Sequence, residues 1–397
     1  MSNILFLFGN GFDINLGLCT SFNDILNEYI NFNKKTKNKY IKKFMENINK
    51  YPNEWANFEK QLGIYSKYFN SKNKNIFIEQ INSFREVMKN KITYEESRIK
   101  TLDRKEHIIN EFFYNSISNI INYLPENSKK YLEKLTIPSD ENNSFTYNFI
   151  NFNYTKTLEK CLKVLKEIGY EKLNRTYNNE YGQHKAKIHF GKILYIHGTL
   201  NEYFILGVDN KNQILNKSFK NDEDMQFLIK PYQNNIIGEN NEIKAKQIID
   251  NSNIICVFGM AIGETDKTWW NYIYNWLKTN NYRHLILFIY NKEINIDDVQ
   301  SIDIHIRNVI NKFYSVLDNI DDKTVRDRIH IPFKHQNMFK INLIDDIIEI
   351  KDKQLISVTN NIYDKYRIVK NIDMVNLGET ANKINELSIG IKKFINR

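Results

Sequence analysis

The first segment along the chain that could form a ligand-binding site is the glycine-rich GNGFD at Gly9–Asp13, which follows the apolar run Asn3–Phe8. Glycine at such a turn lets a phosphate approach without a Cβ in the way, and the helix that follows offers unpaired N–H groups. An ordinary tight turn remains the alternative, because Ile14 stands where G-x-G-x-x-G would have its third glycine. We expect a nucleotide to be bound here by Gly9, Asn10, Gly11 and Asp13.

An amide and an imidazole follow two later apolar runs. Asn153 lies in NFNYT, and such an amide can hold a ribose hydroxyl or a water because it both donates and accepts. Alternatively, Asn153 or Thr155 only caps the next helix. His197 and Gly198 end the run KILYIHG, and a neutral imidazole there can act as a general base near neutral pH. A surface or hydrogen-bonded histidine is the alternative. We predict Asn153 and His197 as catalytic residues, and Gly198 as a residue that contacts the nucleotide.

A second glycine-containing turn, FGMAIGETD, lies between an apolar run and a tryptophan-rich helical pattern. It has the composition of a turn that a phosphate can approach closely. We expect Gly259, Gly263 and Asp266 to contact the nucleotide, with helix capping as the alternative role of Asp266.

The elements that position these segments alternate between strand and helix patterns, which is typical of a parallel sheet with crossover helices. The sequence therefore predicts an α/β protein with a Rossmann-like, mostly parallel sheet. Strands are predicted at Asn3–Phe8, Phe145–Tyr154, Lys192–His197, Tyr203–Val208, Asn253–Phe258 and His284–Tyr290, with a strand pair near Arg328–Leu343. Helices are predicted at Phe22–Ile30, Lys156–Ile168, Asp266–Lys278 and Asp297–Leu317.

The domain organisation follows from a strand-poor, helix-patterned block after the first strand–helix unit. Residues 1–30 and 141–345 are predicted to form the nucleotide-binding core. Residues 31–140 are predicted to be a helical insertion that caps the crevice, and residues 346–397 a helical tail. Caps of this kind shield a reactive centre from water or select substrates.

The composition of the chain argues against nucleic acid, metal ions and membranes as partners. The 397 residues carry a net charge of +9, but lysine is spread along the chain without a compact basic block, so nucleic acid is not the expected partner. Cys19, Cys161 and Cys256 lie far apart without metal-ligand spacing, so no metal is expected. No apolar stretch approaches the about 18 residues of a membrane helix and no signal peptide is evident. These features predict a cytoplasmic protein that does not bind a membrane.

The four segments, in the order GNGFD, NFNYT, IHG and FGMAIGETD, resemble those of the AbiH family of bacteriophage abortive-infection proteins. The resemblance covers roughly residues 4–290 and includes W-x-x-F-E at Trp55–Glu59. Its most specific part is GNGFD followed by LCTSF, where Cys19 replaces an expected proline.

A more distant resemblance is to sirtuin-like NAD-binding domains. It implies that Gly9, Gly11 and Asp13 meet the phosphates and ribose of NAD, that Asn153 orients a water or the nicotinamide ribose, and that His197 is the base. It also implies that Gly259 and Gly263 approach the adenosine, although Ala261 replaces an expected serine. The zinc-binding cysteines of sirtuins are missing from the sequence, which favours hydrolysis of NAD over lysine deacetylation.

Taken together, these observations lead to a first hypothesis of an antiphage abortive-infection effector. It would bind a nucleotide, with NAD as the expected substrate, and hydrolyse its N-glycosidic bond without a metal. The alternative is a non-catalytic nucleotide-binding sensor or regulatory subunit of a phage-defence system, and an effector acting on nucleic acid rests on the net charge alone. Further expected partners are a second copy of the chain or a phage-derived trigger.

Overall fold

The computed structural model of the chain describes residues 2–99, 110–129, 132, 144–168, 175–179, 182–291, 293–318 and 324–340. The chain divides into two compact units, Met1–Leu343 and Ile344–Arg397. The elements described below all belong to the first unit, and the predicted tail at 346–397 lies outside the described residues.

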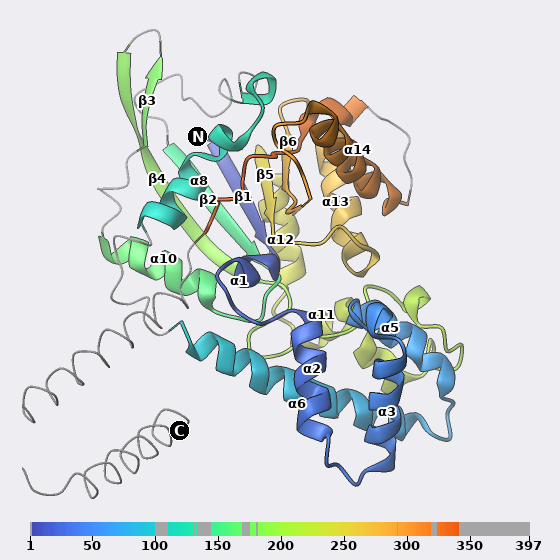
Figure 1. Ribbon diagram of the computed structural model, residues 1–397. Coiled ribbons are helices and arrows are strands. Elements are labelled where there is room, and N and C mark those ends of the chain that lie inside the picture. Colours follow the sequence, from blue (N-terminus) through green and yellow to red (C-terminus); the bar gives the residue numbers. More distant parts are fainter. Residues whose placement is uncertain are drawn as a thin grey trace, which may run out of the picture. The chain divides into compact units, whose positions relative to one another are not determined.

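A seven-stranded sheet forms the centre of this unit, in the order β3-β4-β2-β1-β5-β6-β7 (Figure 1). Six strands run parallel, and β3 pairs antiparallel with β4 as a hairpin. The predicted Rossmann-like, mostly parallel α/β arrangement is therefore confirmed. The strands are β1 (Ser2–Phe8), β2 (Ser144–Asn151), β3 (Arg175–Asn179), β4 (Gly182–Tyr195), β5 (Ile254–Phe258), β6 (His284–Phe288) and β7 (Ile329–His330).

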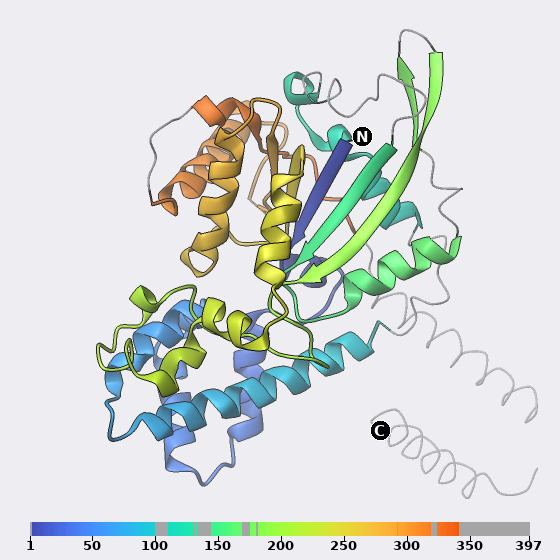
Figure 2. The same cartoon turned by 180° about the vertical axis from the view of Figure 1, so that it is seen from behind.

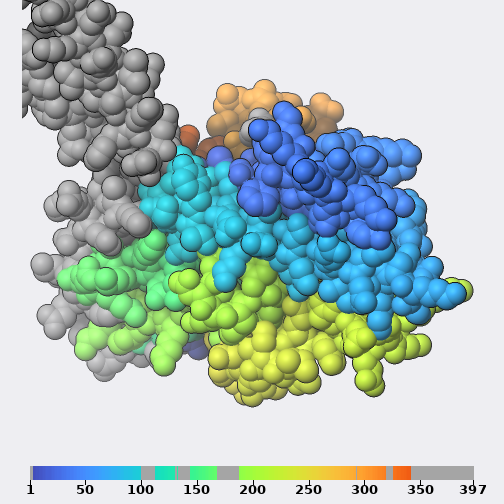
Figure 3. Space-filling view, turned by 90° about the horizontal axis from the view of Figure 1, so that it is seen from below, coloured from blue at the N-terminus to red at the C-terminus, as the bar shows by residue number. Residues whose placement is uncertain are grey.

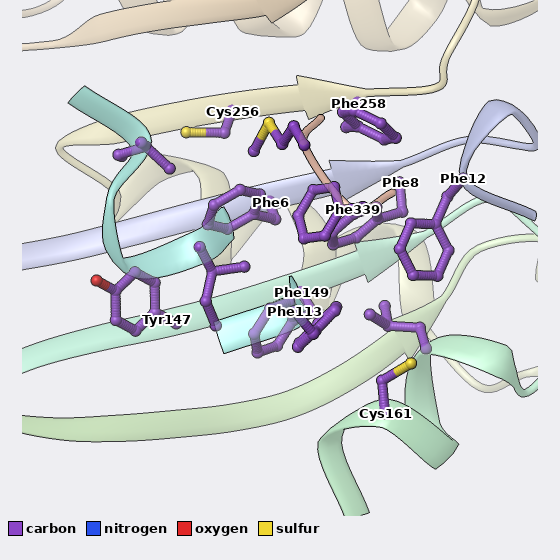
Figure 4. Close-up of a cluster of buried hydrophobic side chains, with 14 of the residues drawn as sticks. Phe6, Phe8, Phe12, Phe113, Tyr147, Phe149, Cys161, Cys256, Phe258 and Phe339 are labelled. Carbon is purple, nitrogen blue, oxygen red and sulfur yellow. The ribbon is translucent and has the colours of Figure 1, made fainter. Parts of the chain in front are cut away.

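Strand β5 and the Ile4–Phe8 part of β1 are apolar and buried at every position because both faces of the sheet are covered. In β1, Phe6 and Phe8 belong to one hydrophobic core, shown in Figure 4, whereas Leu5 and Leu7 belong to the core on the opposite face. Phe8 lies opposite Asn151 in β2 and Phe258 in β5. The three strands therefore end at the same level, and the loops that follow them start side by side.

Helices cover both faces of the sheet (Figures 1 and 2). On one face pack α10 (Thr157–Ile168) and the short α8 (Asn115–Ser118). On the other pack α12 (Asn241–Asp250), α13 (Lys267–Lys278) and α14 (Val299–Ser315). The predicted helices at Lys156–Ile168, Asp266–Lys278 and Asp297–Leu317 are thus confirmed to within two residues at each end. The α12 helix was not predicted.

The remaining helices near the carboxyl edge form a cluster with its own hydrophobic core. It contains α2 (Phe22–Asn33), α3 (Lys39–Lys50), α4 (Pro52–Trp55), α5 (Phe58–Tyr65) and α6 (Lys74–Ser97). Residues 200–229 also supply side chains to this core, and the two parts lie side by side in Figure 3. We call α2 to α6 together with residues 200–229 the helical cap.

The helical cap and the predicted insertion do not contain the same residues. Helix α2 begins at Phe22, outside the predicted insertion, yet it packs in the cap. Residues 200–229 also supply the cap although they lie well after residue 140. Phe113 and Ile117, inside 31–140, instead pack against the sheet. The cap is therefore assembled from segments far apart in the chain.

Two strand predictions are wrong. Tyr203–Val208 contributes only isolated bridges, from Phe204 to Gly198 and from Val208 to Ile229, because Leu206 and Val208 are buried in the core of the helical cap rather than within the sheet. The strand pair near Arg328–Leu343 reduces, within the described residues, to the two residues of β7. Strand β4 begins at Gly182, earlier than predicted, and β3 was not predicted.

The remaining short elements are α1 (Gly11–Asn15) and α11 (Lys230–Ile237), the 3-10 turns η1 (Ser66–Tyr68), η4 (Ile120–Tyr123), η6 (Lys211–Gln213), η7 (Glu223–Leu228), η8 (Glu264–Asp266) and η9 (Thr324–Arg328), and the π-helical turn η3 (Asn110–Tyr114). Helix α2 starts directly after Ser21, because Ser21 forms a capping box with Asp24. None of the described helices is both long and apolar enough to span a bilayer.

Candidate nucleotide site

The four segments selected from the sequence meet at the carboxyl edge of the sheet. The Gly9 N–H donates to the Phe258 carbonyl at 3.0 Å, and the Phe152 N–H donates to the Phe8 carbonyl at 2.9 Å. The Ile196 N–H donates to the Asn151 carbonyl at 3.0 Å. The loops after β1, β2, β4 and β5 are therefore direct neighbours, at the edge where ligands bind in open α/β sheets.

The glycines of the first turn pack against the loop after β5. A Cβ on Gly9 would lie 2.6 Å from the Gly259 carbonyl oxygen, and a Cβ on Gly11 would lie 2.5 Å from the Gly259 Cα. The Gly11 N–H donates to the Gly259 carbonyl at 2.8 Å, and the Phe12 N–H donates to the Gly9 carbonyl at 2.9 Å. These N–H groups are thus used inside the protein, and the absence of side chains serves the contact between two backbones.

Of the two glycines in contact here, Gly11 and Gly259, it is Gly259 that has a left-handed backbone conformation, with φ +69°. Gly11 instead opens the short helix α1. The predicted contact residue Gly263 has no atom within 4 Å of an added Cβ, so its glycine is not required by packing.

The amide of Asn10 closes the loop that leads to α2. Its Nδ2 donates to the Thr20 carbonyl at 2.7 Å, and the Thr20 hydroxyl donates to its Oδ1 at 2.7 Å. Asn10 therefore has a structural contact in addition to any contact with a ligand.

The Asp13 carboxyl is almost completely buried at this edge, with 1% of its surface exposed. Its Oδ2 accepts a 2.7 Å hydrogen bond from the Thr155 hydroxyl, whereas no donor among the described residues reaches Oδ1. Burial raises the pKa of Asp13 to about 7, against the lowering effect of the Thr155 and Thr157 hydroxyls. The carboxyl can therefore gain or lose a proton near neutral pH.

Asn153 links the second loop to the first. Its Nδ2 donates to the Gly9 carbonyl at 3.1 Å, and its N–H donates to Asn151 Oδ1 at 3.1 Å. Its Oδ1 is buried without a hydrogen-bond donor from the part of the chain that the structure describes. Asn153 and Thr155 thus make contacts across the sheet edge, to Gly9 and Asp13, which the capping alternative does not explain.

His197 is buried between two aromatic rings, and the alternative of a surface histidine is wrong. It is 6% exposed, and its ring centroid lies 5.5 Å from that of Phe152 and 6.0 Å from that of Tyr154. Its Nδ1 lies 3.2 Å from the Phe152 carbonyl oxygen. Because a carbonyl only accepts, Nδ1 carries the proton and Nε2 presents a lone pair. Burial, with a further contribution from Lys230, lowers the pKa of His197 to about 3, so the ring is neutral at physiological pH.

The two residues after His197 shape the same loop. Gly198 has φ +73°, and a Cβ there would collide with the Tyr203 carbonyl oxygen at 2.1 Å. This turn lets the Ile205 N–H donate to the His197 carbonyl at 3.0 Å. The hydroxyl of Thr199, which the sequence did not single out, is buried without a partner among the described residues.

A buried ion network joins the helical cap to the loop after β5. Lys230 Nζ lies 2.9 Å from Glu59 Oε2 and 3.2 Å from Asp266 Oδ1. Burial disfavours its charge, but the two carboxylates more than compensate and raise the pKa of Lys230. Burial raises the pKa of Glu59 to about 7, although Lys230 opposes the shift. The Asp266 side chain thus binds Lys230, and its capping alternative is wrong because it makes no cap hydrogen bond to α13.

Sequence reasoning reached only part of this network. Glu59 ends the W-x-x-F-E segment, so it carried a signal, but Lys230 belongs to no such motif and its partners are 171 and 36 positions away. Within the described ranges no group of three His, Cys, Asp or Glu side chains could hold a metal ion.

Fold and site together define a Rossmann-like α/β protein whose carboxyl edge brings a titratable carboxyl, an amide and a neutral imidazole under a helical cap. The family model described as bacteriophage abortive infection AbiH matches residues 5–290, and the chain belongs to this family. Its role is therefore in bacteriophage abortive infection. A comparison with curated proteins finds no match.

Proposed function

We propose that the chain is an abortive-infection effector that hydrolyses the N-glycosidic bond of a nucleotide, with NAD as substrate. The observation that carries this proposal is the set of acceptor atoms at the ends of three adjacent strands. Asp13 Oδ1 and Asn153 Oδ1 are buried without partners among the described residues, and His197 presents Nε2. Acceptors without donors match ribose hydroxyls and the positive charge that develops on a ribose during glycosidic cleavage.

Asp13 is the better candidate for the base. In the proposed step a water oxygen bonds to C1′ of the nicotinamide ribose while the C1′–N bond breaks, and its electron pair stays on the nicotinamide nitrogen. Asp13, with its pKa raised to about 7, takes the proton of the attacking water. The products are nicotinamide and ADP-ribose, and the proton passes from Asp13 to solvent.

His197 and Asn153 take positioning roles in this proposal. An imidazole with its pKa lowered to about 3 is a weak base at neutral pH, but its Nε2 can accept a hydrogen bond from a ribose hydroxyl. Asn153 Oδ1 can accept another from the water or the ribose. The two residues would orient the reacting bond, which is a large part of catalysis when the chemistry requires few groups.

The second candidate function is a sensor that binds a nucleotide without turning it over. The low basicity of His197, which the sequence analysis had assigned as the base, favours this reading. Incubation of purified protein with NAD, NADP and ATP, with nicotinamide release followed by chromatography, separates the two. Release of nicotinamide supports the effector, and binding of NAD by calorimetry without release supports the sensor.

A further inference from the structure

We infer that Arg85 of α6 binds a phosphate of the nucleotide, an inference that rests on the proposed nucleotide ligand. Arg85, held by its hydrogen bond to the Leu206 carbonyl, would form an anion site on the cap side of the carboxyl edge. The sequence analysis had assigned phosphate contact to the first glycine turn instead.

The first glycine turn offers few free N–H donors and little positive charge to a phosphate. The N–H groups of Gly9, Gly11 and Phe12 donate to protein carbonyls. Helix α1 has only five residues, Gly11–Asn15, so its dipole is weak. A nucleotide with two phosphates therefore needs positive charge from another element.

Three other cations, near the site or on α6, are paired with carboxylates. Lys230 is paired with Glu59 and Asp266. Lys91 and Arg98, which also belong to the α6 region, pair with the buried Glu95 at 2.9 Å and 2.6 Å. Glu28 also lies 4.0 Å from Lys91, so the two cations of this group face two carboxylates.

Arg85 differs from these cations. No carboxylate of the described residues lies within ion-pair distance of it, and its Nε is buried without a hydrogen-bond partner there. Its Nη2 donates to the Leu206 carbonyl at 2.7 Å, and its Cζ lies 5.3 Å from the Phe227 ring centroid. A largely buried guanidinium without a counter-charge is costly, and a phosphate would supply both the charge and the acceptor for Nε.

The backbone next to Arg85 leads directly to the site. Ile205, one residue before the carbonyl that Arg85 binds, donates its N–H to the His197 carbonyl and accepts a 2.7 Å hydrogen bond from the Tyr154 hydroxyl. The Tyr154 ring packs against His197. A phosphate at Arg85 would thus lie on the cap side of the groups proposed to hold the ribose.

The test compares ligands with and without phosphate on Arg85→Gln, which removes the charge but keeps an amide donor for the Leu206 carbonyl. Lys89→Met, an exposed lysine of the same helix, is the matched control. Calorimetry should show ADP-ribose binding weakened about tenfold to a hundredfold in Arg85→Gln, as expected for one lost charge-assisted hydrogen bond. Nicotinamide riboside, which has no phosphate, should bind with unchanged affinity, and the control should match the wild type for both.

Inorganic pyrophosphate makes the test independent of turnover. It should raise the melting temperature of the wild type and of Arg85→Lys but not of Arg85→Gln, and in the wild type it should slow hydrogen exchange at residues 204–208. Equal weakening of ADP-ribose and nicotinamide riboside, or a wild type that does not bind pyrophosphate, would overturn the inference. Protection by pyrophosphate only outside residues 204–208 would also overturn it, even if no variant folds. A protein that binds pyrophosphate through Arg85 but releases no nicotinamide would refute the proposed hydrolysis alone.

Discussion

The Thr155 hydroxyl donates a 2.7 Å hydrogen bond to the Asp13 carboxylate across 142 positions of sequence. This contact joins the loop after β2 to the helix after β1, and it leaves the second oxygen of Asp13 as the acceptor that faces no protein donor of the described chain. The hydroxyl and the burial act in opposite directions on the pKa, and burial prevails. Because its pKa is raised to about 7, the protonation of Asp13 can be changed by varying the pH around neutrality.

Asp13→Asn should abolish nicotinamide release while leaving the protein as stable as the wild type or more stable at high pH. The folded pKa of Asp13, about 7, lies above its unfolded value of 3.8, so its contribution to stability is present below pH 3.8 and is lost as the pH rises through about 7. The melting temperature of Asp13→Asn relative to wild type should therefore rise from pH 3.8 to about pH 7 and level off above it.

The corresponding signature in the wild type is activity that increases with pH through about 7, as Asp13 deprotonates. Asp303→Asn, which alters an exposed carboxylate paired with Arg307, is the control and should change neither quantity. Full activity in Asp13→Asn would remove Asp13 from the proposed mechanism.

Gly11→Val should unfold or strongly destabilise the protein, because its side chain would displace the backbone of Gly259, whose Cα would lie 2.5 Å from the new Cβ. Any loss of nucleotide binding then follows from the loss of structure. Gly263→Ala is the matched substitution, since its Cβ would meet nothing within 4 Å, and it should melt with the wild type. Thermal unfolding followed by circular dichroism measures both, and a Gly11→Val protein as stable as Gly263→Ala would contradict the packing argument.

His197→Ala and Asn153→Ala should each leave nucleotide binding within about tenfold of wild type while removing turnover, since orientation of the reacting bond rather than ground-state binding is lost. The double variant should be little worse than either single one, because residues that act as a unit are non-additive. His189→Ala, which alters an exposed histidine of β4, the strand that precedes His197, serves as control. Losses that simply multiply in the double variant would show that the two side chains act independently.

Lys230→Met should lower the free energy of unfolding by about 3–5 kcal/mol, the usual cost of leaving a buried charge without its partner. Adding Glu59→Gln should restore part of that loss because it removes one of the two stranded carboxylates. The neighbouring Lys60, which pairs with Glu264 at 3.2 Å and is half exposed, provides the control. Lys60→Met should cost less than about 1 kcal/mol, and denaturant titration measures all three.

Much of the sheet could be predicted because its strands are buried on both faces. Continuous apolar runs marked β1, β5 and β6. The four segments selected from the sequence follow β1, β2, β4 and β5, and the structure brings them together at one edge of the sheet. The same rule failed at Tyr203–Val208, where an apolar run is buried by helices of the cap instead of by sheet neighbours. Local sequence cannot distinguish these two kinds of burial.

The site was predictable in its residue types but not in its electrostatics. Asp13, Asn153 and His197 stood out as polar groups at strand ends, but their pKa shifts depend on burial by segments distant in sequence. Lys230 and Arg85 could not be found, because each is defined by partners or by a lack of partners that only the folded chain reveals.

Because the helical cap and the sheet combine segments that are far apart in the sequence, the site can be completed only late in synthesis of the chain. Strand β1 pairs with β5, whose residues lie some 250 positions later, and the cap core combines α2 with residues near 229. During translation, β1 and the turn that carries Asp13 are made long before β5 and the loop that packs against that turn. Asp266 is the last member of the ion network to leave the ribosome. A nascent chain shorter than this has no complete site, so the proposed activity cannot begin until Asp266 has been added.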